Sequence, residues 1–311
     1  MSKLRTVLLA IAALVCAALS CAALFCFPAS AQIALDDPRL KTDRILFDYV
    51  EPKNLAQSPL YEAMKKTQVL EKLREFLAPL RLPHPIVIKT ESCGIANSYF
   101  DNDTIKVCYE YIEYIKKMTP RTVRQGLTPN DQLIGPIADV FLHEFGHAVV
   151  RVLDIPFFGK EEDTADYIAT YILLMFSDDD ARRLLLGTTF LAGAEAKEEQ
   201  GKTSELNTLA DSHSLPAQRF FNKWCMAYGS DQALFADAVE LGMLPPHRLK
   251  WCRWEWQTNE DAFKRLIMPY VDIELLKKNK DKKWFNFQAS AADTMSPPKK
   301  EAEALPAAAA K

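Results

Sequence analysis

Two histidines with a glutamate between them, in His143-Glu144-Phe145-Gly146-His147, are the residues of this sequence best suited to chemistry. In an α-helix, residues four positions apart lie on one face, so both imidazoles can reach a single metal ion. Glu144 lies about a quarter turn round the helix, where its carboxylate can take a proton from water. This spacing is typical of a zinc site with a general base beside it.

The helix expected to carry these residues, 139–153, is apolar around most of its circumference. It should therefore be buried, with the metal site inside the fold. Gly146 is a poor helix former, costing about 0.8–1 kcal/mol relative to Ala. Its missing side chain leaves room for a neighbouring segment to pass close to the ion. The alternative is a structural histidine pair that has this spacing by chance.

A catalytic zinc site has three protein ligands and one open position. The next predicted helix, residues 161–176, begins with Glu161, Glu162 and Asp163, and its short connection makes it an antiparallel neighbour of the first. Glu162 is the best candidate for the third ligand, and Asp166 can accept a hydrogen bond from the ring N–H of a ligand histidine. Two alternatives stay open: Glu161 or Asp163 as the ligand, or acidic residues that only favour the helix dipole.

A hydrolytic site of this kind needs a second electrophile for the oxyanion, and His213 is the candidate because the other two histidines lie beside prolines. Asp211, two residues earlier, could orient or charge this imidazole. The alternative is that His213 is exposed and that Asp211 caps the following helix. Arg219 and Tyr228 on that helix are other possible donors.

The remaining pattern predicts helices around a small sheet. Strands are expected at 45–50 and 86–88, and a hairpin over 98–108 that turns at Asp101-Asn102-Asp103. Asn130 or Asp131 should cap the metal helix. Residues 192–208 should form an exposed loop, and helical periodicity is found at 59–80, 109–118, 216–228, 231–241, 246–256 and 259–271. The predicted fold class is α+β, mostly helical, with a small β-sheet and its hairpin packed over the helix of His143.

Residues 1–31 have the layout of a secretory signal peptide. Lys3 and Arg5 precede an apolar run, and Ala29-Ser30-Ala31 is a small-x-small cleavage site. The apolar run is about long enough to span a membrane, so an uncleaved anchor is the alternative. In both cases the rest of the chain is expected to be exported, to the periplasm or the extracellular space.

The chain after residue 31 is expected to divide into a domain over 32–275 and a low-complexity, disordered tail over 276–311. The net charge is −3, or −5 without the two cations of residues 1–31. This balance gives no reason to expect a nucleic-acid partner, or a membrane partner beyond the signal segment.

Four cysteines follow the signal segment: Cys93, Cys108, Cys225 and Cys252. An even number in an exported chain favours two disulfides, and the order along the chain suggests Cys93–Cys108 and Cys225–Cys252. The alternative is four buried thiols. Their spacings are not those of a cysteine-ligated zinc site.

The segments His143-Glu-Phe-Gly-His147-Ala148 and Glu162-x-x-Ala165-Asp166 resemble the gluzincin metallopeptidases, in which a glutamate from a second helix completes the zinc site. Over roughly residues 45–270 the chain is similar to one family of exported, predicted metallopeptidases of unknown function. The motifs that carry this similarity are Cys93-Gly94 with Asn97 and Tyr99, Cys108-Tyr109-Glu110, Asp211-Ser-His213-Ser-Leu215 with Gln218-Arg219, Cys225 with Tyr228-Gly229, and Arg248 with Cys252 and Glu255.

This resemblance implies a zincin-like domain, one Zn²⁺ per chain and hydrolysis of a peptide or protein substrate. By analogy, the sheet edge formed by the hairpin at 93–108 would bind an extended peptide. Zinc would be held by His143, His147 and Glu162, and Glu144 would pass the proton of a water to the leaving amine. The alternative is a secreted zinc-binding scaffold or binding protein whose metal is structural or whose catalysis is lost. An intact Glu144 favours the enzyme, because a structural site has no use for a base beside an open position.

Overall fold

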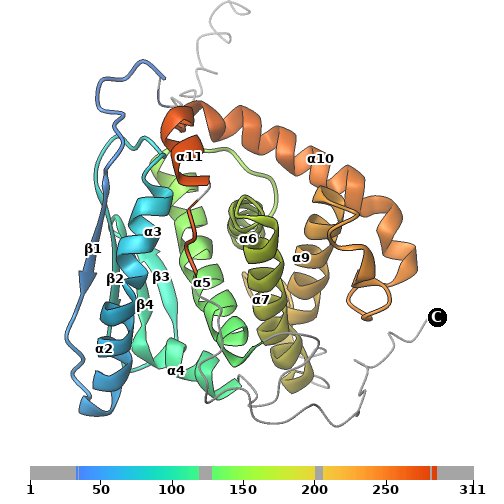
Figure 1. Ribbon diagram of the computed structural model, residues 1–311, viewed down its shortest axis with the longest axis horizontal. Helices are drawn as coiled ribbons and strands as arrows, with labels where there is room; N and C mark the ends of the chain where they lie inside the picture. Colours follow the sequence, from blue (N-terminus) through green and yellow to red (C-terminus); the bar gives the residue numbers. More distant parts are fainter. Residues whose placement is uncertain (1–32, 34, 119–127, 200–205, 281, 286–311) are drawn as a thin grey trace, which may run out of the picture. The chain divides into compact units, whose positions relative to one another are not determined.

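The structure, a computed structural model, describes residues 33, 35–118, 128–199, 206–280 and 282–285 (Figure 1). Residues 35–311 group into one unit and residues 1–34 into another, of which Ile33 is described. The predicted signal peptide therefore lies outside the described residues, as do residues 286–311 of the predicted tail.

A four-stranded sheet forms one layer of the larger unit. Its strands are β1 (Ile45–Tyr49), β2 (Ile86–Glu91), β3 (Ser98–Asp101) and β4 (Thr104–Cys108), in the order β1-β2-β4-β3. The pairs β1/β2 and β2/β4 are parallel, and β3/β4 is an antiparallel hairpin. The hairpin predicted over 98–108 is confirmed, and its short strand β3 is an edge strand.

One face of this sheet is buried and the other is more exposed to solvent. Ile45 pairs with Ile86 and Ile88 pairs with Ile105, so these buried side chains share a face, whereas Leu46 on the opposite face is 50% exposed. The buried face packs on helix α3 (Val69–Leu77) at β1 and β2, and on helix α5 (Pro129–Val152) at β3 and β4. This places the predicted metal helix directly against the edge strand.

The hairpin turns at Asn102 and Asp103, which both have positive φ. Asn and Asp tolerate this conformation, and a two-residue loop of this kind matches the twist of the strands. A disulfide joins Cys93 to Cys108 at the open end of the hairpin. Glu110 accepts hydrogen bonds from the backbone N–H groups of Cys93 and Gly94, so the segment before β3 is held to the start of helix α4 (Tyr109–Met118).

Helix α5 lies between the sheet and helices α6 (Glu161–Leu173) and α7 (Asp178–Glu198) (Figure 1). It packs on both helices, while α7 packs on α9 (Pro216–Ser230) and α9 on α10 (Leu249–Leu266). A second disulfide, Cys225–Cys252, joins α9 to α10. The two predicted pairings are thus both present, and the α+β, mostly helical fold class is confirmed.

Several element boundaries differ from the sequence-based expectation. The helix predicted over 59–80 is two helices, α2 (Ser58–Thr67) and α3, because Gln68 between them is left-handed, with φ 55°. The Tyr49 hydroxyl accepts a hydrogen bond from the Leu70 N–H, which satisfies the exposed start of α3. Thr128, and not Asn130 or Asp131, is the N-cap of α5.

The C-terminal half shows further differences. Helix α7 continues to Glu198, through the first part of the loop predicted at 192–208. The single turn α8 (Leu206–Leu209) begins at the end of that predicted loop. The helix predicted at 231–241 is reduced to a 3-10 turn at Ala236–Ala238, whereas α10 is continuous where a break was expected near residue 258.

Described structure continues past residue 275, where the end of the domain was predicted. Helix α11 (Ile273–Lys280) crosses it, and Asn279 donates a hydrogen bond to the Glu75 carbonyl of α3. Trp284 is 5% exposed and packs edge-on against Phe76. The folded region therefore extends at least to Trp284, because the apolar surface of α3 needs this cover.

Candidate functional site

Helix α5 carries His143, Glu144 and His147 into the interior, where they are 5%, 4% and 6% exposed. The helix begins with a capping box in which Thr128 and Asp131 satisfy each other's backbone N–H groups. Because one face meets the sheet and the others meet α6 and α7, the whole segment is buried, as its apolar composition predicted.

Helix α6 comes unusually close to α5 at Gly146. A Cβ atom built on Gly146 would lie 2.8 Å from the Cα atom of Ala165. No other residue type fits this crossing without movement of one helix. As predicted, the missing side chain of Gly146 lets a neighbouring segment, α6, pass close to the site. This close approach brings the first turn of α6 to the two histidines.

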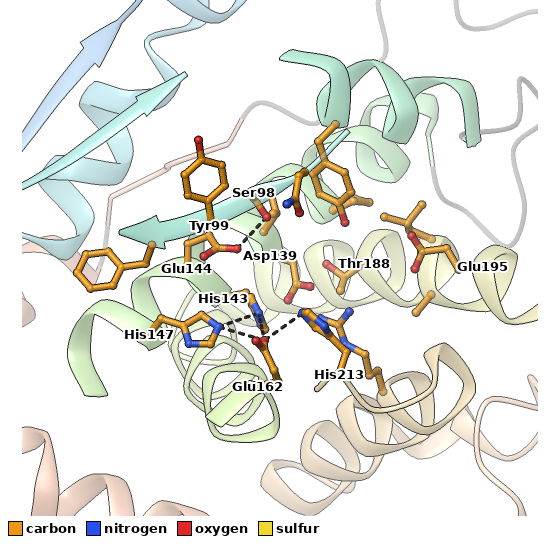
Figure 2. Close-up of a pocket in the computed structure, with 18 of the residues that line it drawn as sticks. Ser98, Tyr99, Asp139, His143, Glu144, His147, Glu162, Thr188, Glu195 and His213 are labelled. Carbon is orange, nitrogen blue, oxygen red and sulfur yellow. Dashed lines mark hydrogen bonds and ion pairs between the residues drawn. The ribbon is translucent and has the colours of Figure 1, made fainter. Parts of the chain in front are cut away.

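Three candidate ligand atoms meet at this crossing (Figure 2). Glu162 Oε2 lies 3.1 Å from His143 Nε2 and 3.1 Å from His147 Nε2, and the two Nε2 atoms are 3.3 Å apart. A tetrahedral zinc ion with bonds of about 2.0–2.1 Å has ligand atoms about 3.3–3.4 Å apart. The donor set and its spacing therefore fit a zinc ion.

Each imidazole has its own carboxylate at Nδ1. His143 Nδ1 donates to Asp166 (2.9 Å), His147 Nδ1 to Glu161 (2.7 Å). These bonds place the proton on Nδ1 and leave the Nε2 lone pair directed at the ligand cluster. Asp166 has the position predicted for it, whereas Glu161, one of the alternatives for the third ligand, contacts the far side of His147.

A buried charge network supports Asp166 from α9. Arg219 donates two hydrogen bonds to Asp166 (2.6 and 2.7 Å), and Lys223 Nζ lies 2.8 Å from Asp139 and 3.5 Å from Asp166. Burial would raise the pKa of Asp166, but the charges of Lys223 and Arg219 and the hydrogen bonds from His143 and Arg219 hold it well below its usual range. Asp166 therefore stays ionised and fixes the orientation of the His143 ring.

Glu144 is not part of the ligand cluster. Its Oε1 atom accepts a hydrogen bond of 2.8 Å from the Ser98 hydroxyl, which lies on the edge strand β3. Burial raises the pKa of Glu144, while the neighbouring His143 and the Ser98 hydrogen bond oppose this shift. A carboxylate with a raised pKa beside a metal site can accept a proton and return it.

His213 reaches the cluster from the loop before α9. Its Nε2 lies 3.0 Å from Glu162 Oε2, and its Nδ1 lies 3.1 Å from Asp211 Oδ1. The Lys160 ammonium donates to the carbonyls of Asp211 and His213, which anchors the loop to the start of α6. The structure thus brings His213 and Asp211 to the site, with the His213 side chain 47% exposed and open to the cavity.

The cluster has the electrostatics of a cation site. Burial lowers the pKa of His143, but hydrogen bonds to Asp166 and Glu162 outweigh it and raise this pKa to about 9. For His147 the hydrogen bonds to Glu162 and Glu161 likewise outweigh burial and raise the pKa. Burial alone would raise the pKa of Glu162, yet the three histidines hold it far below its usual range. This arrangement stabilises positive charge at one point, supplied by protons or by a metal.

One cavity of about 290 Å³ is lined by His143, Glu144, His147, Glu162 and His213. Residues of β3 line one side of this cavity and residues of α5 another, and the remaining sides come from α4, α6, α7 and α9. Among the expected oxyanion donors, Arg219 lines the cavity but is bonded to Asp166. Tyr228 does not line it.

Sequence reasoning missed five residues of the site: Ser98, Glu161 as the partner of His147, the ion pair of Asp139 and Lys223, and Glu195, which lines the far end of the cavity. Asp139 is one turn before His143 on the same helix, and an acidic residue on an otherwise apolar face was a usable signal. The contacts of Ser98 and Glu195 depend on tertiary packing and had no local signal.

Comparison with known proteins agrees with this site. Residues 49–267 match a protein family described as "Putative metallopeptidase". No curated protein and no solved structure gives a significant match. The match covers more than two thirds of the chain and includes every residue of the ligand cluster, Glu144 and His213. The chain therefore belongs to this metallopeptidase family, as its sequence motifs predicted.

Proposed function

We propose that the protein is a zinc-dependent peptidase that cleaves peptide bonds outside the cytoplasm. The observation that carries this proposal is the spacing of His143 Nε2, His147 Nε2 and Glu162 Oε2, which lie 3.1–3.3 Å apart. This spacing and donor set suit tetrahedral zinc with one position left for substrate or water. Membership of the metallopeptidase family supports the same reaction class.

His143, His147 and Glu162 would hold the zinc, which would supply Lewis-acid chemistry by lowering the pKa of a water and polarising a carbonyl. Glu144 accepts the proton of the attacking water and delivers it to the leaving amine. Ser98 holds the Glu144 carboxylate at the cavity wall, and Asp166 and Glu161 hold the two imidazoles. His213, charged or oriented by Asp211, donates to the oxyanion that forms from the carbonyl.

The location is part of the proposal. Two disulfides join cysteines in the folded region, and such bonds persist in oxidising compartments. This agrees with the signal-peptide layout of residues 1–31. Secreted protein should contain no titratable thiol among Cys93, Cys108, Cys225 and Cys252, and four thiols in the native protein would contradict the location.

The principal test is metal content together with cleavage. Elemental analysis of purified protein should find one zinc per chain, and His143→Ala and His147→Ala should lose it. Glu144→Gln should keep the zinc but cleave no peptide of a diverse library that the unaltered protein cleaves. A protein without zinc after loading with excess metal, or a Glu144→Gln variant with full activity, would disprove the proposal.

The second candidate is a binding protein with a closed, structural metal site. The contact of 3.0 Å between His213 Nε2 and Glu162 Oε2 favours it, because a fourth protein ligand would occupy the open position. His213→Ala separates the two. In a peptidase it should lower kcat roughly a hundredfold to a thousandfold and leave zinc content unchanged. In a closed site His213→Ala should weaken zinc binding, and neither the variant nor the unaltered protein should cleave peptides.

A further inference from the structure

The cavity extends beyond the ligand cluster, between α4, α5, α7 and α9, and ends at Glu195 (Figure 2). The lining of this arm is mixed: Val140 and Pro136 of α5 and Leu191 and Ala192 of α7 are apolar, whereas the ion-paired Asp139, Lys223 and Arg219 are charged. A passage that offers apolar side chains to a stem and ends in a carboxylate matches a side chain with an aliphatic stem and a cationic head.

Glu195 is the uncompensated charge of the arm. Asp139 in the cavity lining and Asp166 beside it are bonded to Lys223 and Arg219, so these four charges balance. In the part of the chain that the structure describes, no cationic side chain lies within ion-pair distance of Glu195, and its bonding partner is the Tyr114 hydroxyl. Burial raises its pKa to about 6, while the charge of Arg219 opposes the shift. At neutral pH the arm therefore holds a net negative charge.

Thr188 provides a second, independent observation. It is 3% exposed, it lines the same cavity, and its hydroxyl has no hydrogen-bond partner among the described residues. A buried hydroxyl without a partner is costly, so such a group commonly awaits a ligand atom or water. Thr188 lies one turn of α7 before Leu191 and Ala192, on the way to Glu195.

We infer that this arm is a specificity subsite for a cationic group of the substrate, with Glu195 as the counter-charge and Thr188 as a hydrogen-bonding group along the passage. The cation is the side chain of a lysine or arginine, or the free amino terminus of the peptide. The inference rests on the proposed function in that the ligand is taken to be a peptide. It adds that the site discriminates between peptides by charge.

Binding measured by calorimetry tests the inference without requiring cleavage. The protein is the full chain with zinc bound and Glu144→Gln. The probes are acetylated pentapeptide amides of alanine in which a lysine moves through the five positions, each matched by a peptide with norleucine, which keeps the stem and lacks the charge. At one position, lysine should bind about tenfold to a hundredfold tighter than norleucine, the scale of a charge-assisted hydrogen bond.

Adding Glu195→Gln should abolish this difference and leave the affinity for the norleucine peptide unchanged. Glu198→Gln, which removes a charge from the exposed side of the same helix, should preserve the difference. A norleucine peptide with a free amino terminus is compared with its acetylated form. If the free amino terminus increases the affinity and lysine does not, the bound cation is the amino terminus. Equal affinities for all peptides, no binding of any peptide, or a preference that survives Glu195→Gln would overturn the inference.

Cleavage of the same peptides by the protein with Glu144 intact separates this inference from the proposed function. Peptides that bind with a charge preference but stay uncleaved would contradict the peptidase and leave the subsite standing. The opposite outcome is a rate of cleavage that is the same for peptides with lysine, with a free amino terminus and with neither. Equal rates of this kind would contradict the subsite and leave the peptidase standing.

Discussion

A single hydroxyl connects the edge strand to the proposed general base, and its loss should be measurable. Ser98→Ala removes the hydrogen bond of 2.8 Å to Glu144, so the carboxylate can rotate away from the attacking water. We expect kcat to fall about tenfold, the scale of one hydrogen bond to a charged group, with KM and zinc content little changed. Ser98→Thr keeps the hydroxyl and should recover most of the activity. A kcat unaffected in Ser98→Ala would mean that Glu144 is held by other contacts.

The buried charge of Glu195 should reduce stability in a pH-dependent way. Its pKa is raised by burial from 4.5 to about 6, so between these values the folded state binds more protons than the unfolded state and stability falls as pH rises. Besides burial, the groups that act on this pKa are Arg219 on α9, Tyr114 on α4, and more weakly Glu199 and Glu198 at the C-terminal end of α7.

Near pH 7.5 the folded protein carries the full free-energy cost of burying the ionised Glu195. Glu195→Gln should therefore stabilise the protein by about 1–2 kcal/mol at this pH, because one pKa unit corresponds to about 1.4 kcal/mol. Near pH 4 the two proteins should have equal stability. Urea unfolding at both pH values measures this, and a variant less stable than the parent at pH 7.5 would contradict it.

At the scale of residues, the sequence predicted those contacts of the site that depend on the spacing of residues along the chain. His143, Glu144 and His147 follow from helical geometry, and Glu162 with Asp166 follows from the need for a third ligand on the next helix. Ser98 is 46 residues from Glu144 along the chain, so its contact depends on how the sheet packs on α5. No pattern in one sequence contains that information.

Among elements, the crossing of α5 and α6 sets the position of Glu162. Gly146→Ala would place a Cβ atom 2.8 Å from Ala165 Cα and force the helices apart. Alanine gains about 1 kcal/mol in helix propensity, whereas overpacking costs about 1–3 kcal/mol. We expect a net loss of stability and weaker zinc binding, because Glu162 moves with α6.

Gly193→Ala is the matched control for this prediction. On α7 its Cβ atom would meet the Phe220 ring at 3.6 Å, an ordinary contact. It should stabilise the protein by up to about 1 kcal/mol and leave zinc affinity unchanged. Thermal unfolding and a zinc titration of both variants distinguish the two outcomes. Equal zinc affinity of Gly146→Ala and the parent would show that the crossing does not position Glu162.

The elements that sequence analysis missed were decided by packing. Periodicity continues through Gln68, so the break between α2 and α3 was not visible, and it depends on a hydrogen bond from the Leu70 N–H to Tyr49 on another element. The end of α7 is rich in small and charged residues and resembles a loop, yet its inner face meets α4 and α9. In α10 the Asn259 side chain bonds to the Glu255 carbonyl, so a residue that often ends helices is accommodated inside one.

For the molecule as a whole, the two disulfides should contribute unequally to function. In the chain-entropy model, bridges that close 15 and 27 residues contribute about 3 and about 3.5 kcal/mol. Replacing either pair by alanine should lower the unfolding free energy by about these amounts. Loss of Cys93–Cys108 should also reduce kcat, because the bridge anchors the hairpin that carries Ser98. Loss of Cys225–Cys252 should leave kcat of the folded protein near that of the parent.

Chemical denaturation and steady-state kinetics on the two double variants measure these effects. The two pairs serve as controls for each other, since both remove one bridge from the same domain. A greater loss of kcat on removing Cys225–Cys252 would contradict the assignment of the hairpin to the active site.

The four charges buried beneath His143 constrain how this protein can change over evolutionary time. Lys223 alone cannot mutate to an uncharged residue without leaving Asp139 unpaired in the interior, a loss of about 3–5 kcal/mol. Replacing both partners by apolar residues of similar volume removes that penalty, so the joint change should be tolerated where each single change is not. Among descendants of this sequence, positions 139 and 223 are therefore expected to covary, and Asp166 and Arg219 to be inherited as a pair. An alignment in which position 223 varies freely while Asp139 stays fixed would show that the interior tolerates the lone carboxylate.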